Sequence, residues 1–230
     1  MSTPVWAVVP AAGKGTRFGG DTPKQYLDLA GKPVIQHALE AVLAHPRVAG
    51  VVVVLASGDE LWPGWQALAG KPVLRCIGGG ERADSVLAGL RAIPAADGAT
   101  LVLVHDAARP NLAPADLARL LEAADSHRDG AILAAPLRDT LKRAGAGATI
   151  EATEPRERLW RALTPQAFRL GALRRALEQA RTDGVQVTDE AMAMERIGAR
   201  PRLVEGREDN LKVTTPADLA LAEFLVSRSK

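Results

Sequence analysis

An apolar run followed directly by a glycine-rich loop, near the start of the chain, constrains the fold more than any other feature. Residues 5–9 read Val-Trp-Ala-Val-Val, with no alternation of apolar and polar side chains. Such a run is typical of a strand buried on both faces, as in a parallel sheet covered by helices. Pro10 ends the run, and glycines follow at positions 13, 15, 19 and 20. Their backbone N–H groups can approach an anion without interference from Cβ atoms.

The same loop carries positive charge. Lys14, Arg17 and Lys24 lie among or just after the glycines, and backbone donors together with mobile cations suit a polyphosphate. The loop is not a Walker motif, because Val8 stands where that motif has its first glycine. It is not the dinucleotide fingerprint either, because Phe18 stands at its last glycine. The alternative is a surface loop with solvated charges, since glycine content alone is a weak signal.

Apolar strands and amphipathic helices alternate along the rest of the chain. Buried strands are predicted at 50–55, 73–77, 101–104 and 130–135, and helices begin near residues 33, 81, 114, 170, 188 and 216. The segment 57–70 is interpreted as a short helix with a break, 160–164 as a return to the sheet, and 202–205 and 211–213 as short strands. This order predicts a single α/β domain with a doubly wound, mostly parallel sheet, for which 230 residues are sufficient.

Residues 137–158 differ in composition from the rest of the chain. They are rich in charged side chains, poor in apolar ones, and contain Gly145 and Gly147 near their middle. The flanks 140–142 and 149–151 can pair as a hairpin across these glycines. With little apolar surface of its own, such an arm is expected to project from the domain, and projecting arms often complete a dimer. The alternative is a surface loop without regular structure.

Composition and charge exclude several classes of protein. The formal net charge is +2, and basic residues are mixed with acidic ones along the chain, which argues against a nucleic-acid-binding surface. The lone Cys76 excludes an internal disulfide and fits a reducing compartment. No apolar run reaches the length of a membrane span, and the first residues lack a signal-peptide pattern. We therefore expect a cytoplasmic protein with no membrane partner.

Three polar loops follow predicted parallel strands, at 10–25, 78–85 and 105–110. The carboxyl ends of such strands meet at one crevice, where open α/β sheets bind their ligands. The first loop supplies backbone donors and cations, and the second supplies a helix N-terminus near Arg82 and Ser85. The third supplies Asp106, whose carboxylate suits Mg²⁺, although it could instead pair with Arg109. Together the loops predict a site for a nucleoside triphosphate with a divalent cation.

The chain also resembles a known enzyme family in its motifs and in their order. These motifs are Pro10-Ala-Ala-Gly-x-Gly-x-Arg17 with Pro23-Lys-Gln25, Glu81-Arg-Ala-Asp-Ser-Val86, Val104-His-Asp-Ala-Ala-Arg-Pro110, Arg138-Asp-Thr140, Leu163-Thr-Pro-Gln166, Thr188-Asp-Glu-Ala191 and Asn210-Leu-Lys-Val-Thr214. In this combination the chain resembles the 2-C-methyl-D-erythritol 4-phosphate cytidylyltransferases over nearly its whole length. The first loop is shared with other sugar nucleotidyltransferases, and the stretches around Glu81 and His105 are more specific.

The resemblance implies a reaction in which CTP and methylerythritol phosphate give the CDP-alcohol and pyrophosphate, in the non-mevalonate isoprenoid pathway, with Mg²⁺ as cofactor. The nucleophile is a phosphate monoester whose second pKa is near ~6, so that no general base is needed. The resemblance also implies a Rossmann-like nucleotidyltransferase fold and a homodimer. The implied roles are catalysis by Arg17, Lys24 and Lys212, CTP binding by Ala11, Ala12, Gly13, Gly15, Gly79, Gly80, Ser85 and Asp106, metal binding by Asp106, and acceptor binding by Arg109, Thr140, Arg156, Thr164, Thr188 and Lys212.

Several alternatives stay open at this point. Arg109, Thr140 and Arg156 are expected to act across the dimer, but Arg158 is also within reach of the place given to Arg156. Asp209 is a second, weaker candidate for the metal. A ribitol 5-phosphate cytidylyltransferase would share the CTP half of the site and differ in its acceptor contacts. A non-catalytic nucleotide-binding subunit is disfavoured, because a sensor does not need cations around the α-phosphate.

Overall fold

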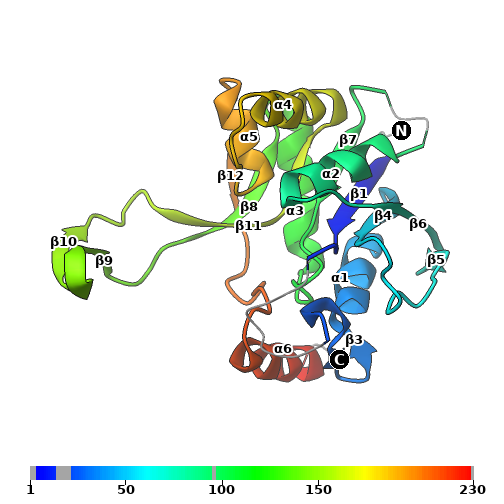
Figure 1. Cartoon of the computed structure of the whole chain (residues 1–230), viewed down its shortest axis with the longest axis horizontal. Coiled ribbons are helices and arrows are strands. Elements are labelled where there is room, and N and C mark those ends of the chain that lie inside the picture. The colour runs from blue at the N-terminus through cyan, green and yellow to red at the C-terminus, as the bar shows by residue number, and fades with distance from the viewer. Residues whose placement is uncertain (1–3, 14–21, 95–96, 229–230) are drawn as a thin grey trace.

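A central mixed sheet organises the protein (Figure 1). The computed structural model describes residues 4–13, 22–94 and 97–228. The sheet has eight strands in the order β12-β8-β11-β7-β1-β4-β6-β5. Their bounds are β1 Val5–Pro10, β4 Val48–Leu55, β5 Ala67–Leu68, β6 Lys71–Ile77, β7 Leu101–Val104, β8 Ala131–Pro136, β11 Trp160–Arg169 and β12 Arg202–Glu205.

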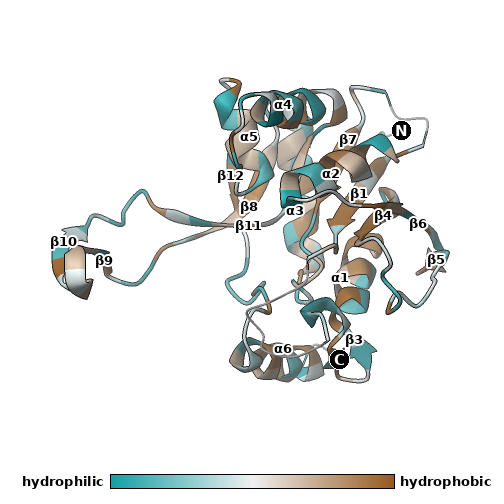
Figure 2. Cartoon of the chain, viewed as in Figure 1, coloured by the Kyte–Doolittle hydropathy of each residue, from teal (hydrophilic) through white to brown (hydrophobic). Residues whose placement is uncertain are grey.

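The middle of the sheet is parallel, as the apolar runs predict. Strand β1 pairs in parallel with β4 on one side and β7 on the other, and β4 pairs in parallel with β6. Strand β11 runs antiparallel between β7 and β8, and β12 is parallel to β8. The predicted return at 160–164 is confirmed, although the strand continues to Arg169. In Figure 2 the central strands β1 and β4 are brown, in keeping with side chains buried on both faces.

Helices cover both faces of the sheet. On one face, α1 (Val34–Leu43) and α3 (Pro114–Ser126) pack in the cluster that contains Val5, Ala7 and Val9 of β1. On the other face, α2 (Arg82–Arg91), α4 (Leu170–Thr182) and α5 (Glu190–Arg196) pack in the cluster that contains Val8 and Val54. The alternation of β1 between the two clusters is the period of two expected of a strand. These two layers confirm the doubly wound arrangement.

The remaining short elements lie around the lower end of the sheet in Figure 1. The 3₁₀ turn η2 (Lys24–Tyr26) is followed by the small hairpin of β2 (Asp28–Leu29) and β3 (Lys32–Pro33). Helix α6 (Pro216–Arg228) closes a third apolar cluster with Leu29, Val34 and Ala108. This cluster ties the start of the chain to its end. No helix in the described ranges is long and apolar enough to cross a membrane.

The predicted hairpin arm is present. Strands β9 (Leu141–Ala144) and β10 (Ile150–Glu154) pair antiparallel, joined through the turn η3 (Ala146–Ala148), in which Gly147 has a φ of +68°. Figure 1 shows the arm standing well away from the sheet, on the two strand extensions that leave β8 and enter β11. Its side chains are mostly exposed, which is why the sequence there is charged rather than apolar.

Two local predictions are wrong. The segment 57–70 holds no helix, because Pro63 and Gly64, which has a φ of +77°, interrupt it in the middle. It is instead an extended loop ending in β5, and Trp62 packs edge-on against Trp65 with 5.1 Å between the ring centroids. Residues 211–213 are not a strand. The Val213 N–H bonds the Ala108 carbonyl at 2.8 Å, in a loop and not in a strand ladder.

Candidate functional site

A pocket opens at the carboxyl ends of β1, β6 and β7, where the sequence predicts it. It is lined by Pro10 at the end of β1 and residues 11–13 after it, Lys24 and Gln25 of η2, residues 79–82 and Ser85 at the start of α2, residues 106–108 after β7, and Lys212 and Thr214 before α6. The three predicted loops therefore converge, and the segment before α6 joins them. Lys14, Gly15 and Arg17 lie outside the described residues.

A buried glutamine holds the first loop to η2. Gln25 donates hydrogen bonds from Nε2 to the carbonyl oxygens of Ala11, at 2.8 Å, and Gly13, at 3.3 Å. The next residue, Tyr26, donates from its hydroxyl to Asp59 Oδ2 at 2.7 Å. Lys24 precedes both on the same turn, so these bonds fix the backbone that carries it. Lys24 is one of the predicted site residues, whereas Gln25 is not.

The glycine turn before α2 is compact because its residues lack side chains. A Cβ on Gly79 would lie 2.4 Å from Asp84 Cβ, and one on Gly78 would lie 2.5 Å from Ser85 Oγ. Glu81 and Asp84 form a reciprocal capping box at the helix start. Ser85 is buried and donates from its hydroxyl to the Glu81 carbonyl at 3.2 Å. The turn thus presents backbone groups of Gly79 and Gly80 to the pocket at the N-terminus of a helix.

Asp106 is the centre of a cluster of charges. Arg82 Nη2 lies 3.2 Å from its Oδ1, Lys212 Nζ lies 2.8 Å from its Oδ2, and Arg109 Nε lies 3.7 Å from the same Oδ2. Burial alone would raise the pKa of this carboxyl, but Arg82 and Lys212 outweigh that effect and hold its pKa well below the usual range. Asp106 is therefore ionised at neutral pH.

A chain of hydrogen bonds fixes the backbone at Asp106. The Thr164 hydroxyl accepts from the Asp106 N–H at 3.0 Å and lies 3.0 Å from His105 Nδ1. The other ring nitrogen of His105 lies 3.0 Å from the Arg109 carbonyl, which can only accept. Nε2 therefore carries the proton, and Nδ1 accepts from Thr164. Burial lowers the pKa of His105 to about 4, so the ring is neutral at pH 7.

The predicted acceptor residues are not all in one place. Thr164 is buried beside Asp106, whereas Thr188 is exposed at the start of α5 and does not line the pocket. Thr140 and Arg156 are exposed on the segments that lead to the arm, and the Arg156 guanidinium donates to the Arg138 carbonyl. Arg158 is exposed on the same segment.

Arg109 is predicted to act in a neighbouring subunit. In this chain its side chain is mostly buried beside Asp106. There it donates from Nη1 to the Asn210 carbonyl at 2.6 Å. Asn210 in turn donates to the Thr164 carbonyl at 2.8 Å. These bonds hold Arg109 next to Asp106, although Arg109 does not itself line the pocket.

The metal candidates are few. In the ranges that the structure describes, no group of three or more His, Cys, Asp or Glu side chains is placed to hold a metal ion. Asp209 pairs with Arg207 and does not line the pocket. Of the two predicted metal candidates only Asp106 lines the pocket, and one carboxylate fits Mg²⁺, which is usually held by one or two carboxylates together with substrate phosphates. One carboxylate is too few ligands for a metal ion that the protein would hold without its substrate.

Arg82 and Glu190 are not among the predicted site residues. Arg82 lines the pocket and contacts both Asp106 and Glu190. Glu190 does not line the pocket and is fully buried. The signal that could have found it is an acid inside the motif Thr188-Asp-Glu-Ala191, at a position that the helical period places inward.

Comparisons with known proteins agree with this geometry. The family model described as 2-C-methyl-D-erythritol 4-phosphate cytidylyltransferase matches residues 5–228. The protein of that name from Stenotrophomonas maltophilia (strain R551-3) is 65% identical over 229 residues, which cover 99% of each chain. That from Xanthomonas axonopodis pv. citri (strain 306) is 64% identical over 225 residues, covering 97% of this chain and 85% of the other.

Solved structures give the same result. A crystal structure of 4-diphosphocytidyl-2C-methyl-D-erythritol synthase superposes with a TM-score of 0.84 at 37% identity, covering 98% of this chain and all of the other. The 2-C-methyl-D-erythritol 4-phosphate cytidylyltransferase from Thermus thermophilus superposes with a TM-score of 0.79 at 34% identity, covering 99% of this chain and all of the other.

Proposed function

The chain belongs to the 2-C-methyl-D-erythritol 4-phosphate cytidylyltransferase family, and from this premise we propose how its residues share the work. The reaction is transfer of CMP from CTP to methylerythritol phosphate with release of pyrophosphate. A ribitol 5-phosphate acceptor is not favoured, since the relatives at 63–65% identity carry the methylerythritol name. What we propose concerns the roles of individual residues, the metal and the subunit arrangement.

The observation that carries the proposal is the placement of Lys24 and Lys212 on one pocket with the Gly79–Gly80 turn. Both reactants are anions, so the enzyme must bring like charges together and stabilise the charge that develops on the α-phosphate. Lys24, Lys212 and Arg17 are proposed to do this. The backbone of residues 11–13 and 79–80, with Ser85 below, is proposed to hold the cytosine and ribose end of CTP.

No residue is needed as a general base, because the attacking phosphate is already largely ionised at pH 7. The pKa values of the nearest candidates agree with this. His105 is buried with a pKa lowered to about 4, and its ring is occupied by hydrogen bonds to Thr164 and Arg109. We assign it a structural role. Asp106 would hold Mg²⁺ together with the triphosphate, and the ion would supply further charge stabilisation there.

The arm is proposed to complete the site of a second subunit. Thr140 and Arg156 lie on the extensions outside the pocket of their own chain, and Figure 1 shows the arm reaching away from the central sheet. A homodimer in which each arm crosses to the other subunit would bring these residues to an acceptor phosphate. The same arrangement gives the charged, weakly packed arm a physical purpose.

The main experiment is steady-state kinetics of Lys24→Ala with CTP, Mg²⁺ and methylerythritol phosphate. We expect kcat to fall by about 10²–10³, the usual cost of removing one stabilising donor, while the Kd for CTP from calorimetry changes far less. Lys32→Ala is the matched control, because Lys32 pairs with Glu40 and does not line the pocket. A raised KM with kcat unchanged would make Lys24 a binding residue instead. Adding a chelator should abolish turnover, and Mg²⁺ should restore it.

Mixing two inactive variants tests the arm. Lys24→Ala and Arg156→Ala, mixed in equal amounts and allowed to exchange subunits, should regain about a quarter of the wild-type activity, because half the dimers are mixed and each has one intact site. Arg158→Ala in place of Arg156→Ala decides between the two arginines. No recovery, with exchange demonstrated by a labelled subunit, would place these residues in their own chain's site.

A further inference from the structure

Glu190 is a fully buried carboxylate just outside the pocket. It is the first residue of α5, its exposed fraction is 0%, and it does not line the pocket. Arg82 donates to both of its oxygens, from Nη1 to Oε1 at 2.5 Å and from Nη2 to Oε2 at 3.2 Å. Burial raises the pKa of Glu190, and the charge of Arg82 opposes that rise. Keeping a charged pair out of water is costly unless the geometry is good.

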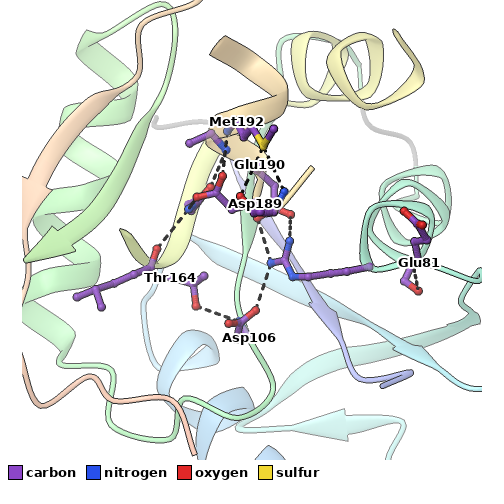
Figure 3. Close-up of polar contacts among 12 residues, drawn as sticks. Glu81, Asp106, Thr164, Asp189, Glu190 and Met192 are labelled. Atoms are coloured by element: carbon purple, nitrogen blue, oxygen red, sulfur yellow. Dashed lines mark hydrogen bonds and ion pairs between the residues drawn. The ribbon is translucent and has the colours of Figure 1, made fainter. Parts of the chain in front are cut away.

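Arg82 joins this buried acid to the site. Its Nη2 also donates to Asp106 Oδ1 at 3.2 Å. The dashed lines in Figure 3 mark these bonds, which run from Glu190 through Arg82 to Asp106 and on from Asp106 to Thr164. A guanidinium is a planar fork, so two bonds to one carboxylate fix the plane in which its remaining N–H groups point. The direction from which Arg82 reaches Asp106 is thus set by Glu190.

The charges of the cluster show what depends on the orientation of Arg82. Two acids, Asp106 and Glu190, face three cations, Arg82, Arg109 and Lys212. If Glu190 lost its charge, Asp106 would be the remaining acid for all three. Arg82 would then be free to turn both arms of its fork to Asp106 and compete with Lys212 for the second carboxylate oxygen, which it now leaves to Lys212 at 2.8 Å.

We propose that Glu190 is a positioning residue for nucleotidyl transfer, which orients Arg82 and thereby keeps Asp106 and Lys212 in their relative places. This inference rests on the roles proposed above for Asp106 and Lys212. The competing view is that the Glu190–Arg82 pair only ties α5 to α2. That view predicts a loss of stability in the variants without a specific loss in turnover.

The test is Glu190→Gln, which keeps the shape of the side chain and removes its charge. We expect kcat to fall by about 10-fold or more, as for other lost transition-state interactions. The Kd for CTP, measured by calorimetry without metal, should not weaken by more than about 3-fold, because the net positive charge that the site gains favours an anion. Glu190→Asp restores the charge in a smaller side chain and should recover part of kcat. A purely structural role through packing would make the aspartate variant no better than the glutamine variant.

Asp125→Asn is the control. Asp125 also accepts two bonds from one arginine, Arg47, but this pair joins α3 to the start of β4, away from the pocket. It should lower the melting temperature and leave kcat unchanged. If Glu190→Gln does not fold, Arg82→Lys serves instead, since an ammonium keeps the charge but cannot hold both acids in one plane.

Lys212→Ala, assayed in parallel, distinguishes a failure of the positioning role of Glu190 from a failure of the proposed site itself. If Lys212→Ala lowers kcat and Glu190→Gln does not, the positioning inference is overturned and the proposed site stands. If Lys212→Ala leaves kcat unchanged, the proposed site itself fails. Equal losses of kcat in Glu190→Gln and Asp125→Asn, in proportion to their losses of stability, would also overturn the inference.

Discussion

Replacing Gly89 by alanine sets two opposing effects against each other in α2. Alanine is the better helix former by about 0.8–1 kcal/mol, so an open site would be stabilised. Gly89, however, faces the sheet, and an added Cβ would lie 2.5 Å from Val8 Cγ1 and 2.8 Å from Val54 Cγ2. Both valines are fully buried in the middle strands. Neither can turn away, because χ1 of a β-branched side chain in a packed core is stiff.

The packing effect should win. Overpacking a well-filled core costs about 1–3 kcal/mol, so subtracting the helical gain leaves a net destabilisation of about 1 kcal/mol. For a protein of this size, this corresponds to a fall in melting temperature of about 2–4 °C. The helix would also shift off the sheet, and Arg82 and Ser85, which lie about two turns and one turn before Gly89, would move with it. A lower kcat should therefore accompany the lower stability.

Urea denaturation of Gly89→Ala, Val8→Ala and the double variant measures this directly. Because the new methyl group can occupy the space that Val8→Ala vacates, the double variant should be less destabilised than the sum of the two by at least about 0.5 kcal/mol. A stabilised Gly89→Ala, near the full helical gain, would refute the reasoning. So would strict additivity of the two changes.

Two further predictions concern the buried polar groups. Gln25→Ala should lower the free energy of unfolding by about 1–2 kcal/mol in urea, because the carbonyl groups of Ala11 and Gly13 lose their donor; an unchanged stability would show that water replaces the amide. His105 has a pKa lowered from 6.5 to about 4 in the folded state, so its contribution to stability is complete above pH 6.5 and is lost as the pH falls toward 4. In urea titrations across that range His105→Gln should lose stability less steeply than the wild type, whereas His45→Gln, at a more exposed ring, should change the slope less.

The parallel strands could be predicted from the sequence, for a physical reason. Strands β1, β4 and β7 are buried on both faces, so their apolar runs are unbroken and need no partner to be recognised. The loops that leave such strands meet at one edge by topology alone. The pocket could therefore be placed before any contact was known, as could the presence of Asp106 and Lys24 on it.

Contacts between distant residues could not be read in the same way. Glu190 meets Arg82 across 108 positions, and an acid at the start of a helix has a sufficient local explanation in the helix dipole. Nothing local in the sequence shows that the Asn210 carbonyl accepts a hydrogen bond from Arg109, 101 positions away. The prediction of a short helix within 57–70 is wrong for a simpler reason. One proline and one glycine outweigh the helical preference of the residues around them.

The two kinds of cation in this site have different surroundings, and the difference follows from their chemistry. Arg82 and Arg109 are largely buried, with side-chain exposures of 29% and 11%, and their forks are engaged by Glu190, Asp106 and the Asn210 carbonyl. Lys212 is more exposed, at 37%, and meets Asp106 as a single point charge. A planar guanidinium holds fixed acceptors with little further loss of freedom, whereas an ammonium on a flexible stem can follow an anion that changes shape as it reacts. The arginines are thus suited to hold the carboxylates in place, and the lysine is suited to the role that we propose for it at the phosphates.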